Sequence, residues 1–136
     1  MNLLKFSLIL LGVVSLTGCA SFLRTPSNLA HINLETVDSP VVLTETVWLE
    51  CKDDIAVVTG YVVKRQGVKD TTATHLDITL LDGTGQVLRE IEAHFEPRQI
   101  PRRYRRPDYA TYRVPLAPLP AGTARIIVRA HEGNHS

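Results

Sequence analysis

The chain has 136 residues, of which 44% are hydrophobic and 21% charged, and this composition excludes an intrinsically disordered protein. A formal net charge of +1 excludes the strongly basic balance of a nucleic-acid-binding domain, so no nucleic-acid partner is expected. The length accommodates one domain of about 100–150 residues together with a short N-terminal segment.

The first eighteen residues differ in kind from the rest of the chain. One positive charge, Lys5, precedes an apolar run over residues 6–16. This run is too short for a transmembrane helix, which needs roughly 20 apolar residues, and it has the length of the hydrophobic region of a signal peptide. We therefore expect residues 1–18 to be a cleaved signal peptide that takes no part in the fold.

A short motif, Leu16-Thr17-Gly18-Cys19, ends this segment. It resembles the lipobox of bacterial lipoproteins; the alternative is an ordinary secretory signal with a chance cysteine. The resemblance implies cleavage between Gly18 and Cys19 and acyl chains on Cys19, which anchor a protein through about 0.8 kcal/mol per buried methylene. Because Ala20 stands where an aspartate would favour the inner membrane, the resemblance also implies an outer-membrane location facing the periplasm.

The stretch after the lipobox is expected to be a lipidated tether over residues 19–40. It contains Pro26, Ser27 and Pro40 and shows little hydrophobic periodicity, as is typical of a linker. An alternative for part of it is that residues 29–34 pack on the domain as a short strand.

From residue 41 onward the pattern is that of strands punctuated by turns. Residues 55–64 are apolar on both faces, which predicts a central strand, whereas Leu76, Ile78 and Leu80 alternate with polar residues. A turn is predicted at Asp82-Gly83-Thr84-Gly85. The expected strands cover residues 41–50, 55–64, 75–82, 86–96, 109–116 and 123–131.

Six or seven short strands without a helical pattern indicate an all-β domain over residues 41–136. We expect an antiparallel β-sandwich of the immunoglobulin or fibronectin-III type, with the single tryptophan, Trp48, in its core. Residues 58–132 loosely resemble the domains of other small lipoproteins, and this resemblance implies no activity.

The most unusual segment is residues 97–107, whose three prolines exclude a regular strand or helix and predict an extended loop. Arginines interleaved with an aromatic residue bind anions bidentately and stack on rings. An anionic lipid, an anionic glycan or an acidic envelope protein is therefore a candidate partner. The alternative is that these arginines pair with Glu90, Glu92 and Glu96 of the same domain. The candidate binding residues are Arg98, Arg102, Arg103, Tyr104, Arg105 and Arg106.

Histidines offer a second kind of chemistry. His131 and His135 are four residues apart, and His75 and His94 flank one predicted hairpin on the same polar face. Neither pair has a spacing that predicts a metal site in a strand protein, so solvated surface histidines are expected and a metal site is the alternative. Cys51 is expected to be a buried, inert thiol.

Nothing in the sequence predicts catalysis. The serines after the signal peptide lie only in the expected tether and tail, and the carboxylates of Asp77, Glu90 and Glu92 fall on solvent faces of strands. No catalytic residue, cofactor or metal is predicted. We therefore expect a lipid-anchored cell-envelope protein that is not an enzyme and acts as a binding or assembly accessory. The alternatives are a structural domain that pairs through a sheet edge and a periplasmic metal-binding protein.

Overall fold

The computed structural model describes residues 28–101 and 109–133, and within these ranges it contains strands and no helix. No helix in this part of the chain therefore has the length and hydropathy needed to cross a bilayer. The seven strands are β1 (Asn33–Val37), β2 (Val42–Lys52), β3 (Ile55–Lys64), β4 (Thr74–Leu81), β5 (Val87–Ala93), β6 (Tyr109–Pro115) and β7 (Arg125–Glu132).

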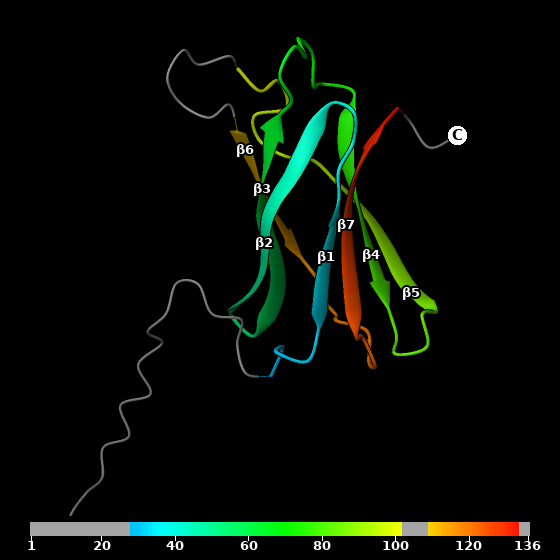
Figure 1. Cartoon of the computed structure of the whole chain (residues 1–136). Coiled ribbons are helices and arrows are strands. Elements are labelled where there is room, and N and C mark those ends of the chain that lie inside the picture. The colour runs from blue at the N-terminus through cyan, green and yellow to red at the C-terminus, as the bar shows by residue number, and fades with distance from the viewer. Residues whose placement is uncertain (1–27, 102–108, 134–136) are drawn as a thin grey trace, which may run out of the picture.

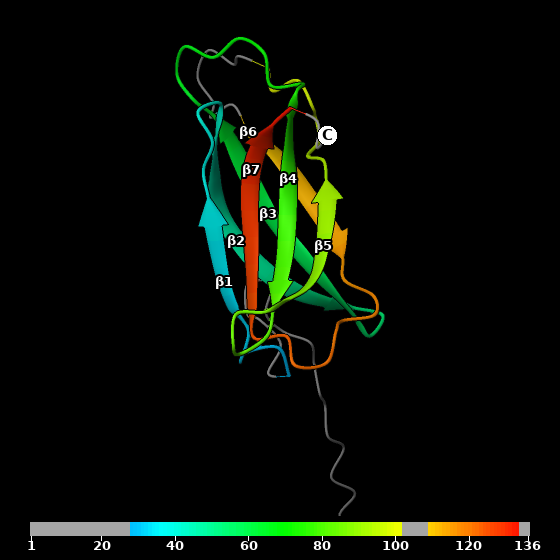
Figure 2. The same ribbon diagram turned by 90° about the vertical axis from the view of Figure 1, so that its right-hand side faces the viewer.

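The strands form two sheets that pack face to face (Figure 1). One sheet has four strands in the order β1-β7-β4-β5, and the other has three in the order β2-β3-β6. Figure 2 shows the four-stranded sheet in front and the three-stranded sheet behind it. Each of the six strands expected from residue 41 onward is present, with ends within three residues of the predicted bounds. The all-β prediction is confirmed.

The hydrophobic core lies between the sheets and follows the alternation read from the sequence. Leu76, Ile78 and Leu80 of β4 are fully buried, and they face Val58 and Val62 of the opposite sheet's central strand. Burying side chains of this size removes roughly 1.5–3 kcal/mol each of unfavourable apolar exposure, which makes this layer the main source of stability.

One glycine lets a large side chain fit into this layer. The ring of Tyr112 on β6 lies against Gly60 of β3, so closely that a Cβ atom at Gly60 would collide with the Tyr112 hydroxyl and with the Thr46 carbonyl. Burial raises the pKa of the Tyr112 phenol well above its ordinary value, since the phenolate would lose its hydration. Gly60 is thus required by packing and not by a turn.

The expected tether over residues 19–40 is wrong in its C-terminal part. Leu29 and Ile32 are buried in the core, and β1 belongs to the four-stranded sheet. β1 pairs with β7 in parallel, so the sheet is mixed and not wholly antiparallel as expected. The alternative of a short strand over residues 29–34 is right in that this segment packs on the domain, but the strand itself is Asn33–Val37. The Glu35 carboxylate and the Arg125 guanidinium join β1 to β7 at 2.8 Å.

Two predictions of burial are also wrong. Trp48 lies on the outer face of the three-stranded sheet, where its ring contacts Tyr61 at a centroid distance of 5.5 Å and its indole N–H donates to Glu50. A bulge in β2 between residues 45 and 47 reverses the alternation, which turns Trp48 outward. Cys51 is exposed because it lies where β2 approaches its hairpin turn, beyond the packed area between the sheets.

Candidate functional site

The strands define two different ends of the molecule. At the turn end lie the start of β1 and the short connections around residues 53–54, 82–86 and 116–124; at the loop end lie residues 38–41, 65–73 and 94–101 (Figure 1). Because β1 and β7 run toward the loop end and β4 runs away from it, the last residues of β7 and the first residues of β4 meet there.

Two loops at the loop end are tied to each other through Thr71. Its buried hydroxyl donates to the Arg98 carbonyl at 2.6 Å and accepts the Ile100 amide at 2.9 Å. The Gln99 amide donates to the Lys69 carbonyl at 2.7 Å, and the Ile100 side chain is completely buried. Residues 97–101 form neither helix nor strand, as the prolines predict, yet these contacts hold the start of the arginine-rich segment against the domain.

Cations at the loop end are hydrogen-bonded to backbone carbonyls. The Lys64 ammonium donates to Ile100 at 3.0 Å, and the Arg98 guanidinium donates to Thr72 at 3.0 Å. Arg65 likewise donates to a carbonyl, that of Ser39, at 2.7 Å. Among the described residues, Lys64, Arg65 and Arg98 form no ion pair. The ion pairs made by arginine there are Arg113–Glu50 and Arg125–Glu35.

This arrangement bears on the alternative that the arginines pair with acids of their own domain. The one described member of the set, Arg98, contacts a carbonyl oxygen and forms no ion pair with Glu90, Glu92 or Glu96 within the ranges covered by the structure. The remaining candidates lie outside the described residues, as do the residues of the expected cleavage and lipidation site. These are Arg102, Arg103, Tyr104, Arg105, Arg106, Gly18 and Cys19.

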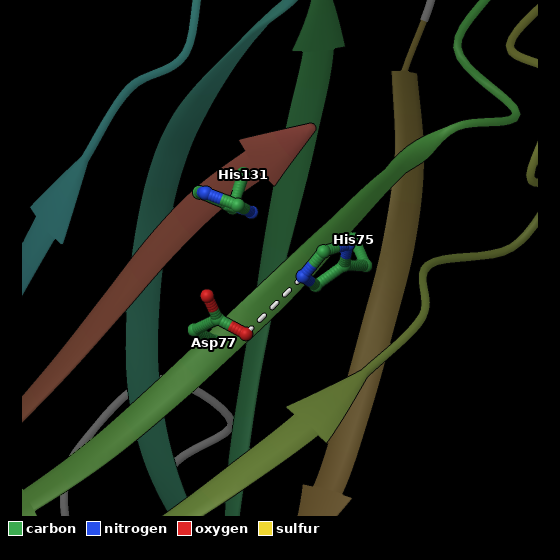
Figure 3. A group of neighbouring side chains, drawn as sticks. All are labelled: His75, Asp77 and His131. Carbon is green, nitrogen blue, oxygen red and sulfur yellow. Dashed lines mark ion pairs between the residues drawn. The ribbon is translucent and has the colours of Figure 1, made fainter. Parts of the chain in front are cut away.

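A cluster of two imidazoles and a carboxylate lies on the outer face of the four-stranded sheet, also at the loop end (Figure 3). His75 on β4 is directly opposite His131 on β7, with ring centroids 5.2 Å apart. Asp77 follows two residues after His75 on the same face, and its Oδ1 is 3.3 Å from His75 Nε2. One candidate ligand atom from each residue lies within 4.8 Å of the other two.

Burial distinguishes this cluster from ordinary surface histidines. His75 is only 4% exposed, although the sequence alternation places it on a solvent face, and Asp77 and His131 are half-buried. His94, expected to share a face with His75, is instead exposed and lies 4.0 Å from Glu92. His135, four residues after His131, lies outside the described residues.

The sequence could not indicate this grouping. His75 and His131 become neighbours only because β4 pairs with β7, two strands that are separated by β5 and β6 in the chain. The available signal was that His75 and Asp77 alternate on one strand face, which places both side chains on the same side of the sheet.

Comparison of the chain with known protein families, with curated proteins and with solved structures finds no match in any of the three.

Proposed function

We propose that this chain is a lipid-anchored protein of the bacterial cell envelope that acts by binding and not by catalysis. Acyl chains on Cys19 hold it in the outer membrane, facing the periplasm. Its loop end presents a cationic surface to an anionic partner, which is a glycan, a lipid headgroup or an acidic envelope protein. The described residues of that surface are Lys64, Arg65, Lys69 and Arg98. We infer that the segment with Arg102, Arg103, Tyr104, Arg105 and Arg106, which lies outside the described residues, contributes to the same binding.

The observation that supports this function best is the bonding of the described cations. Lys64, Arg65 and Arg98 donate to carbonyl oxygens, which orient their side chains without neutralising their charge. Charged donors that are already oriented lose less conformational entropy when an anion binds, and such electrostatic complementarity favours association with acidic partners.

The direction of the chain supports the same arrangement. The described part begins beside the turn end, and the cationic residues are at the opposite end of the strands (Figure 1). A strand the length of β4, with 8 residues, spans roughly 26 Å at about 3.3 Å per residue. With an anchor at Cys19, the turn end would lie nearer the bilayer and the loop end farther from it. The cationic surface would then face the periplasm.

For the fold, the proposal is the two-layer architecture of immunoglobulin and fibronectin-III domains. It is supported by two facing sheets of four and three strands. In an immunoglobulin domain the last strand pairs with the strand before it, whereas β7 lies between β1 and β4. The proposed likeness therefore concerns the layers and not the strand order.

Pairing through a sheet edge has less support as a function. Glu96 already occupies part of the β6 edge, where it exchanges two backbone hydrogen bonds of 2.8 and 2.9 Å with Thr111. On the edge strand β5, the Arg89 guanidinium donates to the Pro118 carbonyl at 3.3 Å. Charged residues on an edge strand oppose the addition of another strand.

The test uses the full chain crosslinked in intact cells. Replacing Arg98, Arg102, Arg103, Arg105 and Arg106 by alanine should abolish capture of the partner, and moderate salt should weaken capture by the unchanged protein, because the Debye length is about 8 Å at physiological ionic strength. A Lys52→Ala/Arg129→Ala variant removes two exposed cations elsewhere and should capture the partner normally.

The anchor is tested separately by Cys19→Ser, which should release the protein from the membrane fraction and eliminate the incorporation of labelled palmitate. Unchanged fractionation would contradict the lipid anchor. Partner capture that survives the arginine substitutions would contradict the proposal of a cationic binding surface. It would not bear on the proposed lipid anchor.

A further inference from the structure

We propose that His75, Asp77 and His131 form a binding site for one divalent transition-metal ion of the zinc type. The site is independent of the proposed envelope function, because it uses neither Cys19 nor the cationic loop residues.

The donor set matches the chemistry of such ions. Imidazole nitrogen suits zinc, copper, iron and nickel, and two histidines with one carboxylate are a recurrent set of three protein ligands that leaves further positions open to water. Calcium and magnesium prefer oxygen ligands throughout, so a site with two nitrogens among three donors discriminates against them.

The distances are close to those of a coordinated ion. Two ligand atoms bound to a tetrahedral zinc ion at about 2.0–2.2 Å lie about 3.3–3.6 Å from each other. His75 Nε2 and Asp77 Oδ1 are 3.3 Å apart, and all three candidate atoms fall within 4.8 Å of one another. The three side chains therefore reach coordination distance by small rotations, without a change in the backbone.

The backbone that carries the ligands is held by the sheet. His75 and Asp77 are two residues apart on β4, and His131 is the cross-strand partner of His75 on the adjacent strand β7. Ligands on paired strands keep their spacing better than ligands on loops. The near-complete burial of His75 also limits the rotamers that its ring can adopt.

Two residues of opposite charge flank the site. The register places Arg129 of β7 and Glu92 of β5 on either side of Asp77, and Thr79 is the next residue of β4 on the same face. Two neutral imidazoles and one carboxylate would leave a bound divalent ion with one net positive charge, and the opposite charges of Glu92 and Arg129 leave that balance unchanged.

The experiment measures Zn²⁺ binding to the full chain in detergent, in a Cys51→Ser background that removes the exposed thiol. We expect one ion per chain and a rise in the midpoint temperature of unfolding when Zn²⁺ is added, since the ion binds only the folded state. Asp77→Asn and His131→Ala should each weaken binding at least about tenfold. His94→Ala is the matched control, since it removes an exposed histidine that directly follows β5, and should leave affinity unchanged.

A second measurement requires no substitution, which covers the case in which a variant fails to fold. In the otherwise unchanged protein, Zn²⁺ should shift the ring resonances of two histidines, His75 and His131, and leave those of His31 and His94 in place. Absence of binding with one-to-one stoichiometry, a loss in His94→Ala equal to that in the ligand variants, or shifts at other histidines would each overturn the proposal.

Discussion

The two ends of this molecule are built differently. At the turn end, the connection over residues 82–86 is short and is closed by local hydrogen bonds, since the Asp82 carboxylate accepts from Thr84 and Gln86. At the loop end, the connections over residues 65–73 and 94–101 are held by contacts between segments far apart in the chain, such as Thr71 with Arg98 and Ile100. The Asp82 turn is therefore self-contained, whereas these two loops depend on tertiary structure.

That difference indicates where binding is expected. A turn whose polar groups are satisfied locally can be exchanged for another turn with little effect, and it offers few groups to a partner. The loop end instead concentrates cations bonded to carbonyls and the cluster of His75, Asp77 and His131. Functional residues gather on long connections that a rigid scaffold positions, and this end has that character.

The largest expected effect compares two threonines. Thr71→Val leaves the buried Ile100 amide and the Arg98 carbonyl without their partner, which should lower the free energy of unfolding by about 2–3 kcal/mol. Thr84→Val, at the exposed turn, should cost no more than about 0.5 kcal/mol. Urea denaturation of both variants measures the difference. Equal losses would show that the loop end is no more dependent on buried contacts than the turn end.

An intermediate effect is expected from two glycines of one turn. Gly85 has a φ of 87°, so Gly85→Ala should cost about 1 kcal/mol through backbone strain, because no neighbouring atom would obstruct the added methyl group. Gly83→Ala, equally open but with an ordinary φ, should change stability by less than about 0.5 kcal/mol. Thermal unfolding of both variants tests whether backbone conformation, and not side-chain packing, determines the stability cost of substitutions in this turn.

The smallest effect concerns pH and should be alike at both ends. Hydrogen bonds from the Thr84 hydroxyl and neighbouring amides lower the pKa of Asp82, and those from Thr72 lower the pKa of Asp70 at the loop end. Because each pKa is lower in the folded state, the stabilisation is fully present above the unfolded value near pH 4 and is lost as the pH falls through the folded value. Asp82→Asn and Asp70→Asn should each flatten the acid branch of the stability profile; a steeper branch would contradict the assignment.

Prediction from sequence succeeded where a strand's environment is recorded in its own residues. The stretch 55–64 is the central strand β3, flanked by β2 and β6 with one face against the other sheet, and its predicted bounds agree with the observed strand. The turn at Asp82 was equally readable, since its side-chain contacts span only four residues.

Prediction failed where distant pairing decides the outcome. The bounds and parallel pairing of β1 depend on its distant partner β7, and Trp48 faces outward only because β2 contains a bulge. The grouping of His75 with His131 has the same origin, because strands that are not consecutive became neighbours in the sheet. Spacing along the chain, which directed attention to His94 and His135, carries no information about such pairs.

The parallel alignment of β1 with β7 has a mechanical consequence. A pull on the chain from its N-terminal side acts along the axis of β1, away from the loop end, and five register pairs resist it together. Hydrogen bonds that lie across the direction of force share the load in shear, whereas an antiparallel terminal strand pulled from its hairpin end would be peeled open one bond at a time. With the Glu35–Arg125 ion pair and the buried Leu29 and Ile32 in the same segment, the first strand is suited to bear tension applied between its N-terminal side and the loop end.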